Sequence, residues 1–531
     1  MRQPASGAPA DPLDSTADDA ARSASDPYSA ARIKRGAFYL IGGKALTALA
    51  GVGTFLLLVR ELPMEQFGAY TILFGLIELV DALSDLGASQ ILSRYVPELL
   101  VKRRHAALRR VVAMALTFRV VVLAIFLASV FALAPLVFPL IGLGDWQWAA
   151  KAYLAVVLVR VVELSLFGVL ESMLHQAIAQ LGFSLVTVVR FGLLAVAAAN
   201  AGLRLETVIA IELTTDLIGC GVLLIGLMRR IPRHPGRANE DAAAWLRGNW
   251  SRMRAFGLKG YAQHLLIIPY VGSTNRLLVG GTLASAEVAL FGFAQSVTDL
   301  IYRYLPANLL VGIIRPVLTA RYVRDRQFAD LELAANLIFK INATLICAAA
   351  VMIFAGGKPM LDVVTRGKYH EGVVALLLLM CALLLAYSMR SMLDHVCHAL
   401  EHNGPLIWAN ALMLLSLPPG IALLPVVGVY ALPAANLSGA ILACTVIAWR
   451  LSREGFRFRY DLAGLARLLG ATGLAMLGAT AVQATDVGWF MVAGFALAGF
   501  AVALHFGRIY RQTEQRLIVT MLRGRRGQSG P

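Results

Sequence analysis

Two apolar runs of membrane length follow one another between Gly36 and Arg110, in GAFYLIGGKALTALAGVGTFLLLVRELPMEQFGAYTILFGLIELVDALSDLGASQILSRYVPELLVKRRHAALRR. The first run, Ala37–Val59, carries one cation, Lys44, and the second run, Tyr70–Leu92, carries the three carboxylates Glu78, Asp81 and Asp85. A spanning helix needs about 20 mostly apolar residues. Charges inside a bilayer are costly, so those within a span predict a functional role by default. The stretch therefore predicts a pair of membrane helices with charged faces.

The composition indicates that the whole chain is a membrane protein. Its 531 residues are 58% hydrophobic and only 15% charged, with a mean hydropathy of +0.69. A soluble domain is about half apolar and a quarter charged, which excludes a soluble enzyme. The five cysteines lie in apolar segments or at their ends, without a pairing framework, and are interpreted as reduced packing residues.

Fourteen stretches have the length and composition of a membrane span, and Pro425 with Gly428 separates the eleventh from the twelfth. They are 37–59, 69–91, 111–137, 149–171, 183–201, 206–228, 257–280, 286–312, 334–355, 372–393, 405–424, 428–449, 464–483 and 487–506. Of the 48 Lys and Arg residues, 34 fall in alternate connections and the tails, and 6 in the opposite connections. Because cytoplasmic segments carry the excess of Lys and Arg, both termini are predicted to be cytoplasmic. The net charge of +16 is then mostly topology and attraction to anionic lipid headgroups, and no nucleic-acid partner is predicted.

An internal repeat divides the chain. Leu62–Tyr70 (LPMEQFGAY) resembles Leu283–Phe291 (LASAEVALF), and the same offset of 221 places Glu78 on Asp299. Six helices in each copy give both the same orientation, so we expect an all-α protein with two parallel six-helix halves around a central cavity, plus two extra C-terminal helices. The predicted units are a disordered N-tail (1–35), the first half (36–230), a cytoplasmic linker (231–256), the second half (257–451), helices 13 and 14 (452–507) and a basic C-tail (508–531).

Cations on equivalent helices of the two halves are the first candidates for a binding site. Lys44 shares a helix face with Thr47 and Thr54, which predicts a polar stripe on a cavity, although Lys44 could instead snorkel to the interface. Arg276, in the seventh predicted span, has no carboxylate within a turn of its own helix. Two unpaired cations on matching helices predict a shared anionic ligand, since Arg binds phosphate through its planar fork and Lys as a point charge.

Other charged groups in the spans have a structural alternative. Arg303 can pair with Asp299 on its own helix and Arg160 with Glu163, while Arg190 has acidic residues on the next span, Glu212 and Asp216. Arg303 and Arg190 are also kept as candidate cavity cations. Arg390 is interpreted as reaching headgroups at the inner end of the tenth span.

The carboxylates Glu78, Asp81 and Asp85 share one face of the second helix, at spacings of three and four. Three like charges on a dry face repel, so water, paired cations or protonation must relieve them. They predict either a proton or cation site coupled to transport, or ion pairs that lock the bundle, with Asp85 capping the end of the span. The spacing alone is compatible with both hypotheses.

Catalytic motifs do not occur in the sequence. It has no Walker motif, no DxD motif and no GxSxG, and its outward loops are short. His395, His398 and His402 have a spacing that could hold a metal, but the aligned segment of the first half keeps only His175. We therefore predict no cofactor, no resident metal and no enzymatic activity.

The sequence resembles the polysaccharide biosynthesis proteins, the Wzx-like oligosaccharide-lipid flippases of the multidrug/oligosaccharidyl-lipid/polysaccharide exporter (MOP) superfamily. The resemblance covers about Gly36 to Arg459 and rests on the FGxY turn at Phe67–Tyr70, the DLG at Asp85–Gly87 and the SRY at Ser93–Tyr95. An acidic residue is common in the family where Asn275 stands. Related members are MATE-type multidrug antiporters and peptidoglycan-precursor flippases.

The resemblance implies a function. A polyprenyl-diphosphate-linked oligosaccharide, a unit of O-antigen, capsule or exopolysaccharide, would cross the bacterial inner membrane by rocking of the two halves, with cavity cations on the diphosphate. It implies membrane lipids as further partners and leaves open a polymerase or export complex. The alternatives are an ion-coupled multidrug antiporter of the same fold, a membrane polymerase or ligase of the same glycans, and a non-transporting scaffold of an export complex.

Overall fold

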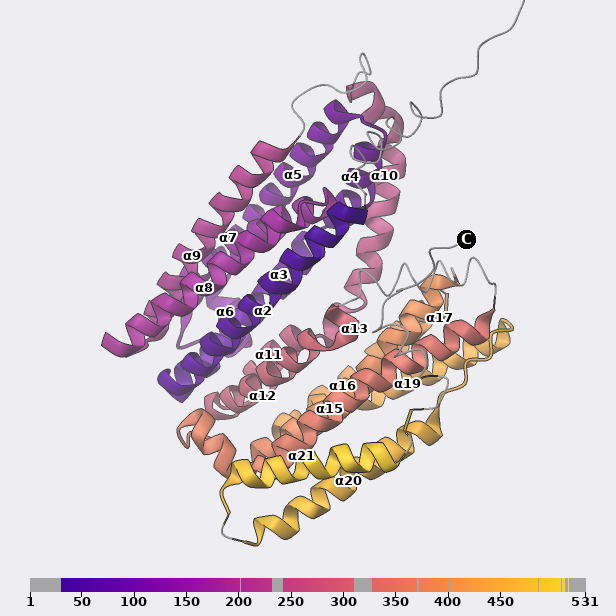
Figure 1. Cartoon of the computed structure of the whole chain (residues 1–531). Helices are drawn as coiled ribbons and strands as arrows, with labels where there is room; N and C mark the ends of the chain where they lie inside the picture. Colours follow the sequence, from indigo (N-terminus) through magenta and orange to yellow (C-terminus); the bar gives the residue numbers. More distant parts are fainter. Residues whose placement is uncertain are drawn as a thin grey trace, which may run out of the picture.

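The computed structural model describes residues 30–200, 202–231, 242–309, 327–369, 372–400, 402, 404–485, 487–507, 509–510 and 514, with the side chains of residue 43 onward except residue 45. Within these ranges the chain forms helices and no strands (Figure 1). Ten helices are long and apolar enough to cross a membrane, and Gly404–Arg453, which contains two predicted spans, counts once among the ten. These findings confirm an all-α polytopic membrane protein. The predicted tails lie largely outside the described residues.

The helices follow the predicted order along the chain. The first group is α2 (Ala30–Glu61), α3 (Met64–Ser84), α4 (Ala88–Val101), α5 (His105–Ala132), α6 (Ala134–Leu140), α7 (Gln147–Ser172), α8 (Gln176–Asn200) and α9 (Leu205–Arg230). The second group is α10 (Ala242–Leu265), α11 (Gly272–Gly280), α12 (Ser285–Tyr304), α13 (Pro306–Leu309), α15 (Phe328–Thr365), α16 (Gly372–Ala399), α17 (Gly404–Leu414), α18 (Leu417–Val427) and α19 (Ala431–Arg453). Helices α20 (Leu462–Gln483) and α21 (Trp489–Phe506) complete the chain.

The seventh predicted span is not one helix, which corrects the expectation for 257–280. Helix α10 already begins inside the predicted linker and ends at Leu265, a short 3-10 helix covers Ile268–Tyr270, and α11 begins at Gly272. Pro269 lacks a backbone N–H and cannot continue a helix. The break that results brings Tyr270 into the core of the second group.

The second predicted span also breaks, at the DLG sequence between α3 and α4. The Asp85 carboxylate accepts hydrogen bonds from the backbone N–H of Gly87 (3.2 Å) and of Ser89 (3.1 Å). Gly87 has a φ of +88°, and a Cβ on it would lie 2.4 Å from the carbonyl oxygen of Gly257 in α10. Glycine is therefore required twice here, by the left-handed backbone and by the close approach of α10.

The apolar core is continuous at one end of the molecule and divided at the other. One cluster joins residues of both groups near the α2–α3, α11–α12 and α15–α16 connections, including Leu62, Phe291 and Tyr369. Two further clusters belong mainly to one group each: Tyr95 lies in the first, and Val396 and Leu451 lie in the second. We call these the joined end and the split end. Figure 1 shows the two groups of helices diverging from the joined end.

The joined end is fastened by polar contacts between the two groups. The Lys368 ammonium, after α15, donates to three carbonyl oxygens at the end of α2, those of Val59 (3.0 Å), Arg60 (2.6 Å) and Leu62 (2.7 Å). These are carbonyls of a helix C-terminus, where a cation is favoured. Arg366 adds an ion pair with Glu61 at 2.9 Å. The contacts lie across the interface between the two groups and hold this end closed.

The repeat inferred from the sequence matches the packing at the centre. Helices α3 and α12, which align at the offset of 221, pack against each other. A Cβ on Gly68 of α3 would lie 2.9 Å from the Ser285 carbonyl oxygen, and one on Gly292 of α12 would lie 2.4 Å from the Thr71 side chain. The two glycines allow the helices to approach closely. This approach places the equivalent residues Glu78 and Asp299 on one cavity.

Candidate functional site

A cavity of about 750 Å³ lies between the two groups of helices. Its wall on the first group comes from α2, α3, α7 and α8, and its wall on the second from α11, α12 and α16. Lys44 and Arg303 of the predicted site line it, as does Glu78. The predicted central cavity is therefore present.

The cavity cations stand at one depth. Lys44 in α2, Arg303 in α12 and Arg390 in α16 are each 17 or 18 residues from the joined-end terminus of their helix. At a rise of about 1.5 Å per residue, that distance is roughly 26 Å for all three. We call these residues the cation layer. If the joined-end termini mark one boundary of a hydrocarbon core about 30 Å thick, we expect the cation layer near the headgroups of the leaflet at the split end.

The carboxylates Glu78 and Asp299 lie deeper, each 14 residues from the joined-end terminus of its helix. That corresponds to roughly 21 Å. Glu78 is exposed to the cavity and has no hydrogen-bond or ion-pair partner among the described residues. Asn275, which also lines the cavity, is 4% exposed, and its Oδ1 has no hydrogen-bond partner in the part of the chain that is described.

Arg276 was expected to be an unpaired cation, but the structure pairs it with Asp299. Its guanidinium is buried, bonds the Asp299 carboxylate at 2.7 Å and stands 5.5 Å from the centre of the Phe74 ring. The expectation considered only carboxylates within a turn of Arg276, whereas Asp299 is on the next helix. The same contact replaces the expected Asp299–Arg303 pair. Arg276 therefore stands behind Asp299 rather than on the cavity wall.

Two carboxylates of the predicted acidic face are bound by a cation that the sequence analysis missed. Arg119 of α5, 4% exposed, makes ion pairs with both Asp81 and Asp85. A signal existed, because Arg119 is a lone charge in an apolar run. This is the bundle-locking alternative. Asp85 stands at the C-cap position of α3, but its carboxylate accepts from the backbone N–H groups of Gly87 and Ser89 and so caps the start of α4 rather than the end of α3. Ion coupling through Glu78, Asp81 or Asp85 stays a prediction.

Arg190 is not placed on the cavity. It is buried in the first group, where its guanidinium pairs with Asp216 and donates to the Thr215 hydroxyl at 3.2 Å. Arg160 bonds Asp216 as well, at 2.7 Å, and lies 3.8 Å from Glu163. The pairing of Arg190 with the sixth predicted span is thus observed. This arrangement of charges is structural in the described state.

Arg390 was expected to extend its side chain to the headgroups, and the structure corrects the direction of the side chain, not the depth of the residue. Its side chain is turned inward: it is 9% exposed, hydrogen bonds the Asn410 side chain, and stands 5.4 Å from the centre of the Tyr270 ring. Tyr270 in turn donates to Asn410 at 3.1 Å. The break in the seventh span positions Tyr270 for this contact. Sequence reasoning could not place Arg390 because it assumed a continuous helix there.

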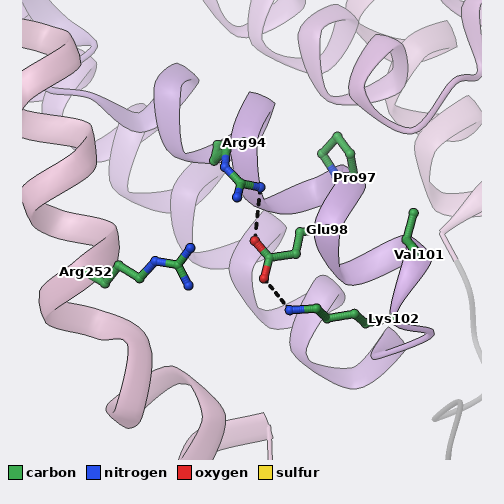
Figure 2. A pocket seen from close by; sticks show the side chains of 6 residues that line it. All are labelled: Arg94, Pro97, Glu98, Val101, Lys102 and Arg252. Carbon is green, nitrogen blue, oxygen red and sulfur yellow. Dashed lines mark hydrogen bonds and ion pairs between the residues drawn. The ribbon is translucent and has the colours of Figure 1, made fainter. Parts of the chain in front are cut away.

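A second hollow, of about 490 Å³, lies between α4 and α10 (Figure 2). Glu98 bridges Arg94 (3.0 Å) and Lys102 (2.6 Å), and Arg252 of α10 faces them. The hydrogen bond from Lys102 lowers the pKa of Glu98, and desolvation of the carboxylate offsets part of this shift. Arg94 and Arg252 both lie over the Tyr95 ring, at 5.9 and 5.7 Å. The SRY sequence thus ties α4 to α10 at the split end.

The arrangement of side chains around the cavity suits the binding of a ligand and the movement of the two halves. Among the described residues, no group of His, Cys, Asp and Glu could hold a metal. His402 pairs with Glu454 at 2.6 Å instead of converging with the other two histidines. The cavity offers cations at headgroup depth and hydrogen-bonding groups below them. Together with the closed and divided ends, these features define a membrane transporter built from two helical halves.

The chain belongs to the polysaccharide biosynthesis protein family, whose sequence model matches residues 33–313. A search of curated protein sequences returns no match.

Solved structures share the fold at low identity. Lipid II flippase MurJ in an inward closed conformation aligns with a TM-score of 0.67 and 11% identity, covering 90% of this chain and 99% of its own. An inward-facing multidrug resistance MATE family transporter of the MOP superfamily aligns with a TM-score of 0.59 and 15% identity, covering 77% and 94%. The MATE multidrug transporter DinF-BH aligns with a TM-score of 0.55 and 16% identity, covering 81% and 97%. Together with the family match, these structures confirm the MOP superfamily that the sequence analysis suggested.

Proposed function

We propose that the protein moves a polyprenyl-diphosphate-linked oligosaccharide across the bacterial inner membrane by alternating access. One observation carries the proposal: Lys44, Arg303 and Arg390 lie at a similar distance from the joined end, which we take as headgroup depth, on the wall of a cavity shared by both halves. A lipid-linked diphosphate has its charge at this depth while its tail stays among the lipids. Cations on both halves can then bind one diphosphate.

The direction of transport follows from charge. The split end bears the connections that hold most Lys and Arg, which supports a cytoplasmic position for it. The substrate enters there, and closure of the split end with release of the Lys368 contacts delivers it to the other side. A protein of solved structure described as a lipid II flippase shares this fold, which supports movement of a lipid-linked substrate. No covalent bond is made or broken.

The role that we propose for each residue follows from its place relative to the cavity. Lys44 and Arg303 bind the diphosphate from opposite halves, and Arg276 acts through Asp299. Arg190, which lies off the cavity, supports the fold. Membrane lipids surround the halves, and a polymerase or export complex remains a proposed partner on the release side.

Complementation of a strain that lacks its own flippase tests the proposal. Lys44→Ala and Arg303→Ala should each reduce surface polysaccharide at least about tenfold, since a charged hydrogen bond contributes roughly 1.5–3 kcal/mol, and Lys44→Arg should be milder. Lys358→Ala is the matched control, because Lys358 is exposed and its ion pair, with Asp362, lies within its own helix. Normal polysaccharide in both cavity variants, with protein in the membrane at the wild-type amount, refutes the diphosphate role.

A multidrug antiporter is the second candidate. The observation that favours it is Glu78, a cavity carboxylate with no ion-pair partner among the described residues, because cationic drugs need a negative cavity. The three cations of the cation layer argue against it, with the Asp394 carboxylate, which also lines the cavity, offsetting part of their charge. Drug resistance conferred by expression of the protein, lost in Glu78→Gln, would support the antiporter over the flippase.

A further inference from the structure

The deeper part of the cavity has the chemistry of a glycan site. Phe74 and Glu78, one turn apart on α3, occupy one wall, and Gln295 and Asp299, their equivalents at the offset of 221, occupy α12. The Gln295 amide donates to Asp299 at 2.8 Å, which orients both groups. Sugar rings present an apolar face and a rim of hydroxyls, which an aromatic ring with neighbouring carboxylate and amide groups can contact together.

Asn275 gives independent evidence that a ligand belongs here. Its side chain is 4% exposed and lines the cavity, and its Oδ1 has no hydrogen-bond partner among the described residues. A buried polar atom without a partner is costly, and such atoms need an explanation. Oδ1 itself is covered in the described state, so a sugar hydroxyl would donate to it once the Asn275 side chain turns into the cavity.

The charge of this region selects among sugars. Asp299 is neutralised by the buried Arg276 behind it, whereas Glu78 has no such partner among the described residues and faces the cavity. The cations of the cation layer stand closer to the split end, where the diphosphate lies. The region that receives the first sugars therefore carries one uncompensated negative charge.

We infer that the deeper cavity is a binding site for neutral or amino sugars, and that Glu78 excludes sugars bearing a carboxylate next to the diphosphate. This inference rests on the proposed function and specifies its substrate class. A like charge in a partly desolvated cavity is unfavourable, and an amino group or hydroxyl is favoured at the same position.

Two lipid-linked glycans that differ in one sugar test the inference. A flippase-deficient strain is supplied with a pathway whose first sugar is a neutral N-acetylhexosamine, or with one whose first sugar is a hexuronic acid. Surface glycan is quantified for each. The wild-type chain should export the neutral glycan at least about tenfold better than the uronate glycan, the factor that a modest like-charge repulsion produces.

The ratio of the two exports is the decisive quantity for variants. Glu78→Gln should raise the ratio of uronate to neutral export about tenfold, because it removes the repelling charge and keeps the side-chain shape. Glu78→Asp, which keeps the charge, should leave the ratio low. Asp362→Asn is the matched control, because it removes a carboxylate that lies outside the cavity.

An equal export of both glycans by the wild-type chain overturns the inference, and so does an unchanged ratio in Glu78→Gln. Export of neither glycan by the wild-type chain instead overturns the proposed function, and the inference with it. The ratio distinguishes specificity from a folding defect, because a misfolded variant loses both exports together.

Discussion

Lys368→Met should shift the protein toward the state in which the joined end is open. The ammonium contacts three carbonyl oxygens of the α2 terminus at 2.6–3.0 Å and lies on the second half of the chain, so separation of the halves must break these contacts. Methionine has nearly the same length but no donor, so the carbonyls of Val59, Arg60 and Leu62 lose this partner.

The magnitude follows from the contacts and from solvation. A cation at a helix C-terminus contributes up to about 2 kcal/mol in a partly buried geometry. Burial lowers the pKa of Lys368, with Glu61 opposing the shift and Arg366 adding to it, so desolvation offsets part of the attraction. We therefore expect a net loss of about 1–2 kcal/mol, which changes the equilibrium between the two states about 5- to 30-fold.

Cysteine labelling measures this equilibrium. Ser391 lines the cavity, so Ser391→Cys provides a probe that a membrane-impermeant maleimide can reach from the joined-end side only when that end opens. Labelling from this side should rise severalfold in Lys368→Met. Lys358→Met is the control, because the ion pair of Lys358 with Asp362, at 2.6 Å, lies within α15. Equal labelling in the two variants, with both proteins folded, would refute the role of Lys368 as a latch.

Three further substitutions test the packing, each by the midpoint of thermal unfolding in detergent. Gly87→Ala should destabilise by about 2–4 kcal/mol, because a positive φ is strained for alanine and its Cβ meets Gly257; an unchanged midpoint would contradict the close approach of the α3–α4 connection to α10. Arg190→Met should cost about 3 kcal/mol or more by removing a cation from buried Asp216, with Arg190→Lys milder, and equal losses would argue against the charge as the cause. Lys340→Met should cost a similar amount, about 3–5 kcal/mol, because the buried ammonium contacts Asp461 and, at 2.8 Å, Glu514; wild-type stability would show that these contacts do not anchor the C-terminal segment.

Local patterns predicted the membrane class and most helices, since hydropathy over about 20 residues reports what a bilayer can accept. The internal repeat also predicted correctly that Glu78 and Asp299 would be equivalent, and both line the cavity. The break at Pro269 was missed because the run around it is apolar enough to resemble one span. Backbone breaks buried in protein do not need to change the hydropathy of the sequence.

The sequence by itself determined that this chain is a polytopic helical membrane protein with related halves, because apolar length and Lys/Arg asymmetry are properties of single segments. Only the tertiary structure decided which charges face the cavity. Arg276 finds Asp299 and Arg119 finds Asp81 and Asp85 on other helices, whereas Glu78 has no such partner among the described residues and faces the cavity. The physical reason is that an ion pair between helices depends on how each helix is rotated and packed, which spacing along one helix does not specify.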